Sequence, residues 1–229
     1  MKFNLLLYAV TDRTWEGPLT LEEQLEEAIK AGVTLVQLRE KDLGYDDFIK
    51  SSKQIKAITD RYHIPLIIND NVEVALSIDA DGVHIGQEDL EAGHVRKLLG
   101  PDKILGVTAK TVEQALQAQE QGADYLGSGA VFGSQTKLNT RPMSKETLQS
   151  ITKAVSIPVV AIGGINQENI MELAGTGVAG AAVVSGIFAS KDIGKTVKTL
   201  RHYAEKITDK TIDKITDKTT EKNYRKYTK

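Results

Sequence analysis

Short β-rich runs of hydrophobic residues alternate along the chain with longer segments that have the periodicity of amphipathic helices. The predicted strands are Leu5–Thr11, Thr34–Lys41, Pro65–Asp70, Gly82–Gly86, Ile104–Thr108, Tyr125–Val131, Pro158–Gly164 and Gly180–Gly186. The predicted helices between them include Leu21–Lys30, Asp46–Arg61, Val112–Gln121 and Gln167–Ala174. Eight successive strand–helix units predict a single α/β domain, a closed (β/α)8 TIM barrel. A doubly wound open sheet has similar local patterns and is the alternative.

An internal repeat supports the barrel independently of the strand count. Small residues end a helix just before each even-numbered strand, as in Ala31-Gly32-Val33 and Gly122-Ala123-Asp124. Strands three and seven begin alike, with Ile64-Pro65-Leu66 and Ile157-Pro158-Val159. The chain therefore has a two-strand period repeated four times, and such internal periodicity is typical of a repeated architecture.

The C-terminal segment differs in composition from the rest of the chain. Ile207-Thr208-Asp209-Lys210 is followed by the similar Thr211-Ile212-Asp213-Lys214 and Ile215-Thr216-Asp217-Lys218. This low-complexity, mixed-charge segment has few residues that could join a core. We therefore expect the catalytic barrel to cover residues 1–206, and residues 207–229 to form a frayed or disordered tail.

The overall composition excludes several classes of function. The chain has 229 residues, a net charge of −2 and no cysteine, which argues against a broad nucleic-acid surface, a thiol nucleophile and thiolate metal sites. The four histidines are not spaced as zinc ligands. No apolar run is long enough to span a membrane, and the first residues run directly into a strand. We expect a cytoplasmic protein; composition leaves a homo-oligomer open.

The segment Gln37–Lys41 at the end of the second predicted strand carries the most informative polar residues. Strand alternation places Gln37, Arg39 and Lys41 on one face, and Val36 and Leu38 on the other. Both faces of a parallel barrel strand are covered, and burying an unpaired charge costs several kcal/mol or more. The two cations thus require an anionic partner, which is either a structural carboxylate or a multiply charged ligand. We favour the ligand.

Polar residues also follow the other predicted strands. Because active sites of such barrels lie at the C-terminal ends of the strands, these positions are the candidate site. In chain order they are Asn69 and Asp70 after strand three, His84 and Asp89 at strand four, Thr108 at strand five, Ser134, Thr136 and Lys137 after strand six, Gly164 after strand seven and Ser185 after strand eight.

Asp70 and Asp89 are candidate ligands of a metal ion. Two carboxylates without imidazole or thiolate neighbours suit a hard cation such as Mg²⁺ better than zinc. Each aspartate precedes a predicted helix, so each could instead be an N-cap. Beside Arg39 and Lys41 the metal interpretation is favoured, and the four residues together indicate a metal–pyrophosphate site.

Several features have two interpretations. Gly163-Gly164 before the predicted helix Gln167–Ala174 could bind a phosphate at the helix N-terminus, or could be an ordinary turn. Gly127 and Gly129 share a face, and their missing side chains leave room either for a ligand or for crowded barrel neighbours. His84 is either bonded within the core or in contact with a ligand. The loop Ser134–Arg141, with Lys137, is either a lid that closes on an anion or a solvated loop.

These motifs, taken together, resemble the thiamine-phosphate synthase family. They are Gln37-Leu38-Arg39-Glu40-Lys41, Ile68-Asn69-Asp70, Gly82–Asp89, Gly122–Gly127, Thr136-Lys137 and Ala161–Ile165, and the resemblance covers residues 5 to about 203. The family joins a hydroxymethylpyrimidine diphosphate to a thiazole phosphate, with Mg²⁺, and releases pyrophosphate.

The resemblance also implies a role for each candidate residue. Arg39, Lys41, Asn69, Thr108 and Lys137 would hold the diphosphate, and Arg39, Lys41 and Lys137 would be catalytic. Asp70 and Asp89 would bind Mg²⁺. Gln37 and His84 would contact the pyrimidine, and Ser134, Thr136, Gly164 and Ser185 would hold the thiazole phosphate.

The chain departs from the family pattern at four positions. Ser134 replaces a usual threonine and Thr108 a usual serine, and both exchanges keep the hydroxyl. Ala130 and Gly133 stand where prolines are usual, which should loosen the loop after strand six. Gly133→Pro is then expected to tighten substrate binding modestly, provided that residue 133 has a φ that proline can adopt.

Two other functions are the alternatives. The first is a thiazole tautomerase on the same barrel, which would not need Arg39, Lys41, Asp70, Asp89 and Lys137 together. The second is a non-catalytic protein that binds thiazole phosphate or thiamine phosphate, which the sequence excludes only poorly.

Overall fold

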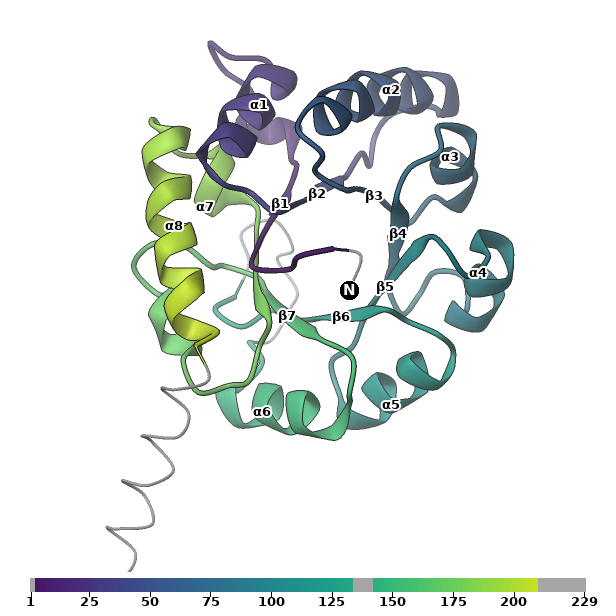
Figure 1. Ribbon diagram of the computed structural model, residues 1–229, viewed down its shortest axis with the longest axis vertical. Helices are drawn as coiled ribbons and strands as arrows, with labels where there is room; N and C mark the ends of the chain where they lie inside the picture. The colour runs from purple at the N-terminus through teal and green to yellow at the C-terminus, as the bar shows by residue number, and fades with distance from the viewer. Residues whose placement is uncertain (1–2, 134–141, 210–229) are drawn as a thin grey trace, which may run out of the picture.

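Eight parallel strands form a closed barrel in the computed structural model, which describes residues 3–133 and 142–209 (Figure 1). Each strand pairs with the next, and β1 pairs with β8, so the open doubly wound sheet is excluded. The strands are β1 (Leu7–Val10), β2 (Leu35–Leu38), β3 (Leu66–Asn69), β4 (Gly82–Ile85), β5 (Ile104–Thr108), β6 (Tyr125–Gly129), β7 (Val159–Ile162) and β8 (Gly180–Val183).

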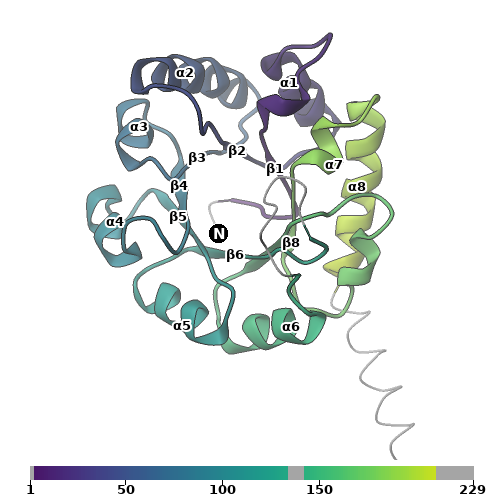
Figure 2. The same ribbon diagram turned by 180° about the vertical axis from the view of Figure 1, so that it is seen from behind.

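Helices surround the barrel (Figures 1 and 2). They are α1 (Leu21–Ala31), α2 (Tyr45–Arg61), α3 (Val72–Ser77), α4 (Ala92–Leu99), α5 (Val112–Glu120), α6 (Lys145–Ala154), α7 (Ser185–Phe188) and α8 (Ile193–Ile207), with short 3₁₀ helices η1 (Arg13–Trp15) and η2 (Ile170–Leu173). No helix within the described ranges is long and apolar enough to cross a membrane. The predicted tail lies almost entirely outside the described residues, which end two residues after α8.

The predicted α-helix Gln167–Ala174 is wrong, because this segment forms only η2. Two asparagine side chains accept hydrogen bonds from backbone N–H groups just before η2. Asn169 Oδ1 accepts from the Asn166 N–H, and Asn166 Oδ1 accepts from the Glu168 N–H, at 2.9 and 2.8 Å. Such local bonds give the backbone an alternative to α-helical hydrogen bonds.

The alternation of side chains along the strands builds two apolar layers. Val36 and Leu38 of β2 belong to the large core between the sheet and the helices. Leu35 joins a second cluster with Ile67 and Ile104, which fills the inside of the barrel. The N-terminal segment crosses one end of the barrel (Figure 1), and there Phe3 packs 5.6 Å from Tyr125, measured between ring centroids.

The predicted two-strand repeat has a physical basis at this same end. Asp81, just before β4, accepts the Leu66 N–H of β3 at 2.9 Å, and Asp124, just before β6, accepts the Leu105 N–H of β5 at 2.8 Å. Thr34, just before β2, does the same for β1 at 3.0 Å. These bonds pair the strands where each begins, so the opposite end of the barrel is left for the site.

Candidate active site

One cavity of about 1170 Å³ opens at the C-terminal ends of the strands. All of the predicted site residues that the structure describes line it: Gln37, Arg39, Lys41, Asn69, Asp70, His84, Asp89, Thr108, Gly164 and Ser185. Ser134, Thr136 and Lys137 lie outside the described residues. The cavity thus lies where the sequence predicted it, at the C-terminal ends of the strands, while the role of each residue stays a prediction.

The two cations that follow β2 have different surroundings. Lys41 Nζ donates to Asp70 Oδ2 at 2.7 Å, so a structural carboxylate partners this lysine. Arg39 is held through its backbone N–H, which donates to Thr11 Oγ1 at 3.0 Å, and its side chain takes part in no ion pair among the described residues. The guanidinium of Arg39 is therefore a cation on the cavity wall that is available to an anionic ligand.

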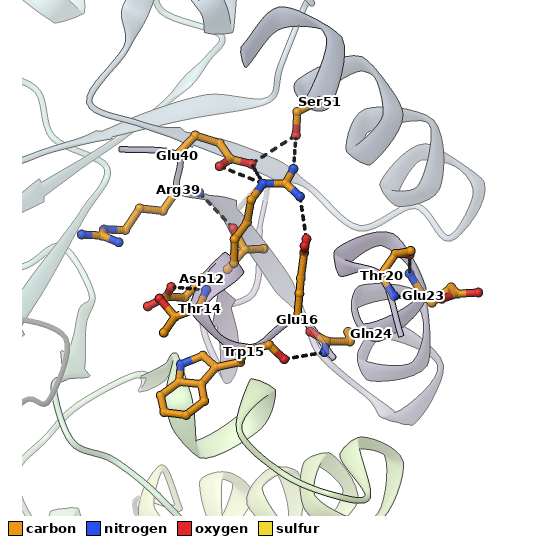
Figure 3. Close-up of polar contacts among 12 residues, drawn as sticks. Asp12, Thr14, Trp15, Glu16, Thr20, Glu23, Gln24, Arg39, Glu40 and Ser51 are labelled. Atoms are coloured by element: carbon orange, nitrogen blue, oxygen red, sulfur yellow. Dashed lines mark hydrogen bonds and ion pairs between the residues drawn. The ribbon is translucent and has the colours of Figure 1, made fainter. Parts of the chain in front are cut away.

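The Glu40 side chain points away from the Arg39 side chain and links η1 to the end of β2 (Figure 3). Its carboxylate accepts from Arg13 Nε at 2.8 Å, and Arg13 also donates to Ser51 Oγ at 2.9 Å and to Glu16 Oε1 at 2.6 Å. The Glu40 side chain is only 4% exposed, and burial raises its pKa, although the charge of Arg13 opposes the shift. This network holds η1 against the end of β2, so that Trp15 lines the cavity.

The two aspartates line the cavity just after β3 and in the loop after β4. Asn69 Nδ2 donates to Asp70 Oδ1 at 2.5 Å, and the Gly86 N–H donates to Asp89 Oδ2 at 2.6 Å. The N-cap interpretation is wrong for both aspartates. Asn71 caps α3 through a bond from the Val74 N–H at 2.9 Å, and Glu91 occupies the N-cap position of α4.

The electrostatics of Asp89 show that the two carboxylates are neighbours. Burial raises its pKa, the bond from the Gly86 N–H opposes that shift, and the negative charge of Asp70 raises the pKa further. A bound cation would relieve this repulsion. Within residues 3–133 and 142–209 no group of three or more histidine, cysteine or acidic side chains could hold a metal. A pair of carboxylates suits Mg²⁺, which usually keeps waters and takes phosphate oxygens as its other ligands.

His84 is bonded within the core, as one of its two interpretations predicted, and it also lines the cavity, so its contact with a ligand stays a prediction. Its Nδ1 lies 3.0 Å from Tyr125 Oη, and its Nε2 lies 3.0 Å from Thr108 Oγ1. Tyr125 Oη in turn lies 2.8 Å from Tyr8 Oη, to which Gln37 Nε2 donates at 2.6 Å. A continuous chain of hydrogen bonds therefore crosses the barrel beneath the cavity.

The glycine pair after β7 is required by close backbone packing. Gly163 and Gly164 have φ of +103° and +69°, and a Cβ on them would lie 2.4 Å from Ala130 Cβ and 2.3 Å from the Gly133 oxygen. The turn interpretation therefore has a structural cause, although Gly164 also lines the cavity. The expected helix N-terminus is absent here, because η2 begins only at Ile170.

The glycines of β6 make room for protein atoms. A Cβ on Gly127 would lie 3.0 Å from His84 Cε1, and one on Gly129 would lie 1.9 Å from the Ile162 oxygen. Crowding inside the barrel thus accounts for both, although both also line the cavity.

Gly133 does not meet the condition that was set for its replacement by proline. Its φ is +77°, whereas the proline ring holds φ near −65°. The expected gain in substrate binding from Gly133→Pro therefore no longer follows.

Sequence reasoning missed several residues of this region. Lys110 lines the cavity and lies two residues after β5, so the expectation that the site lies at the C-terminal ends of the strands could have found it. Tyr8 and Tyr125 lie in predicted strands with inward-facing side chains, but the bond between them joins residues 117 positions apart. Trp15 lies in a loop, and no sequence signal places it at the cavity.

The fold and the site define a (β/α)8-barrel enzyme whose cavity gathers cationic, acidic and glycine-rich strand ends. The family model described as thiamine monophosphate synthase matches residues 7–187. The thiamine-phosphate synthase of Ruminiclostridium cellulolyticum is 52% identical over 199 residues, covering 87% of this chain and 95% of that protein. That of Clostridium tetani is 53% identical over 194 residues, covering 85% and 93%.

A solved structure agrees with these relatives. Thiamine phosphate pyrophosphorylase from Pyrococcus furiosus superposes with a TM-score of 0.81 at 36% identity, covering 90% of this chain and 97% of that one. The chain belongs to the thiamine monophosphate synthase family and is a transferase.

Proposed function

We propose that the enzyme joins a hydroxymethylpyrimidine diphosphate to a thiazole phosphate, with Mg²⁺, giving thiamine phosphate and pyrophosphate. One observation carries this proposal. Arg39, Lys41, Asp70 and Asp89 line a single cavity, where they combine cations for a diphosphate with two carboxylates for a metal ion.

The diphosphate is assigned to the cations and donors of β2, β3 and β5. Arg39 supplies a planar guanidinium, which suits two phosphate oxygens at once. Lys41 exchanges its bond with Asp70 for a bond with the diphosphate, which frees the Asp70 carboxylate for the metal. Asn69 and Thr108 supply neutral donors beside these charges. Lys137 is assigned to the same group from the motif alone.

Asp70 and Asp89 are the proposed Mg²⁺ ligands. The supporting observation is the repulsion from Asp70, which adds to burial in raising the pKa of Asp89, because a divalent cation between the two carboxylates would remove that repulsion. Bound Mg²⁺ would neutralise charge on the diphosphate and on its pyrophosphate product. Gly86 holds Asp89 toward this position through its N–H.

The proposed reaction is a dissociative substitution. The bond between the pyrimidine methylene carbon and the diphosphate oxygen breaks, and its electron pair leaves with pyrophosphate. The ring amino group of the pyrimidine stabilises the resulting cation, and the neutral thiazole nitrogen then forms the new carbon–nitrogen bond. Arg39 and Lys41 stabilise the charge that grows on the leaving group, and such preorganised electrostatics is often the largest contribution to catalysis. No activated serine or cysteine is needed.

The remaining candidate residues are assigned to the two organic groups. Gln37 and His84 are proposed to contact the pyrimidine from the base of the cavity. Gly164 and Ser185 lie at the ends of β7 and β8, where barrels of this type usually bind phosphate, and are assigned to the thiazole phosphate. Ser134 and Thr136 join them from the motif alone.

The test is product formation by the purified protein. Incubation with both substrates and Mg²⁺ should give thiamine phosphate and pyrophosphate in equal amounts, and a chelator should stop both. Isomerised thiazole phosphate without pyrophosphate would instead identify a tautomerase. Binding without any chemical change would identify a non-catalytic binding protein.

A further inference from the structure

We infer that the hydrogen-bond chain beneath the cavity holds His84 as the neutral Nε2–H tautomer and thereby directs the hydroxyl proton of Thr108 toward the ligand. Tyr125 is the positioning residue in this arrangement, since it acts on the ligand only through His84. The inference concerning Thr108 rests on the proposed function, because the diphosphate would accept that proton. The tautomer of His84 does not depend on it.

The donor-to-acceptor direction of this hydrogen-bond chain follows from its first residue, Gln37. Gln37 presents its amide nitrogen to Tyr8 Oη at 2.6 Å, and an amide N–H can only donate. Tyr8 Oη therefore accepts from Gln37. Among the described residues, Tyr125 Oη at 2.8 Å is the acceptor that the proton of Tyr8 can reach, so Tyr8 is the donor in this bond. Tyr125 then has its proton left for His84 Nδ1 at 3.0 Å.

The tautomer of His84 follows from the same reasoning. A neutral imidazole whose Nδ1 accepts a hydrogen bond carries its proton on Nε2. That Nε2–H donates to Thr108 Oγ1 at 3.0 Å, so the threonine oxygen accepts from inside the barrel. The hydroxyl proton of Thr108 is then available to an acceptor in the cavity, which Thr108 lines.

Burial stabilises this direction of the hydrogen-bond chain. Gln37, Tyr8 and Tyr125 are all buried, and an unmade hydrogen bond at a buried polar group costs about 1–3 kcal/mol. Burial also raises the pKa of both tyrosines, so each phenol keeps the proton that the chain requires.

The opposite direction would need Gln37 to present its oxygen to Tyr8. Every bond would then reverse, His84 would carry its proton on Nδ1, and Thr108 would donate inward. The orientation of the Gln37 amide group therefore decides whether Thr108 presents its hydroxyl proton or its oxygen lone pair to the cavity.

The barrel is shaped to hold the two rings. A Cβ on Gly106 would lie 2.3 Å from Tyr125 Oη and 2.5 Å from His84 Nδ1. The absence of a side chain in β5 thus allows the hydroxyl and the imidazole to meet. The His84 and Tyr125 ring centroids are 5.5 Å apart, in a tilted arrangement.

The first test is nitrogen-15 NMR of histidine side chains in the substrate-free, full-length protein, with His84 assigned by comparison with His84→Gln. The inference predicts the nitrogen shifts of a neutral imidazole protonated on Nε2. A histidine protonated on Nδ1 would overturn it. This measurement uses no substrate, so it stands whether or not the proposed function is correct.

The second test compares Tyr125→Phe with Tyr45→Phe. Tyr125→Phe removes the donor to His84 Nδ1 and keeps the ring, whereas Tyr45 is an exposed tyrosine of α2. Tyr125→Phe should change the His84 nitrogen shifts, and Tyr45→Phe should leave them as they are. Unchanged shifts in Tyr125→Phe would overturn the inference.

Turnover then tests the role of Thr108. Tyr125→Phe should lower kcat by about tenfold, which corresponds to one hydrogen bond to a charged group, and Tyr45→Phe should not. Unchanged kcat in a Tyr125→Phe protein whose His84 shifts have moved would overturn the role given to Thr108. Absence of thiamine phosphate formation by the wild type would instead refute the proposed function and leave the NMR result intact.

Discussion

Gly106→Ala is expected to displace the two rings beneath the cavity. The new Cβ would lie 2.2 Å from Tyr125 Cζ, 2.3 Å from its Oη and 2.5 Å from His84 Nδ1. Carbon atoms in contact are about 3.5–4.0 Å apart, so at least one ring must retreat by about 1 Å or more. Tyr125 is fully buried, so its ring cannot swing into solvent, whereas His84 lines the cavity and is only partly buried.

This overlap sets the expected losses of stability and of turnover. Overpacking of a filled core costs about 1–3 kcal/mol, which for a chain of this size lowers Tm by about 2–12 °C. A displacement of about 1 Å at an active site can reduce turnover by about 100-fold. Gly93→Ala is the matched control, because Gly93 lies in helix α4 and its new Cβ would be 3.7 Å from the nearest atom, Gln121 Cγ, an ordinary contact distance. That variant should be as stable as the wild type or slightly more stable.

The assay combines urea unfolding with the rate of thiamine phosphate formation, for both variants and the wild type. Gly106→Ala should lose stability and turnover together, while Gly93→Ala retains both. If Gly106→Ala kept wild-type stability and turnover, the tight contact between β5 and the two rings would be refuted.

Four further predictions follow from the same geometry. Arg39→Ala should lower turnover by about 100-fold or more with little change in Tm, and near-normal turnover of the folded variant would exclude its role. Asp70→Asn and Asp89→Asn should each raise the Mg²⁺ concentration for half-maximal activity by about tenfold or more, and an unchanged requirement would exclude them as ligands. Gly133→Pro should lower stability, measured by thermal unfolding, because proline cannot adopt a φ of +77°. Glu40→Gln should cost about 1–3 kcal/mol in urea unfolding by removing the buried one of the two carboxylates that pair with Arg13, and no loss would show that the network is dispensable.

The barrel was predictable because its signals are local and repeated. Alternation in β2 correctly separated Gln37 and Arg39 from Val36 and Leu38, since a strand has a strict period of two. The helical pattern of Gln167–Ala174 misled because two asparagine side chains compete for the backbone there. Such competition depends on side-chain rotamers, which cannot be predicted from the spacing of hydrophobic residues.

The location of the site was also predictable, because parallel strands deliver their C-terminal ends to one face. The partners of individual residues were less accessible to sequence. Nothing local pairs Lys41 with Asp70, or gives the capping position to Asn71 in place of Asp70. The bond between Tyr8 and Tyr125 depends on the diameter of the closed barrel, and Gly106 has meaning only beside those rings.

The most direct test of the central claim is a crystal structure with the pyrimidine diphosphate and Mg²⁺ bound. We expect the diphosphate in the cavity against Arg39, with Mg²⁺ on Asp70 and Asp89 and with Lys41 moved from Asp70 to the diphosphate. A diphosphate bound elsewhere on the barrel, or a metal ion that contacts neither aspartate, would contradict it.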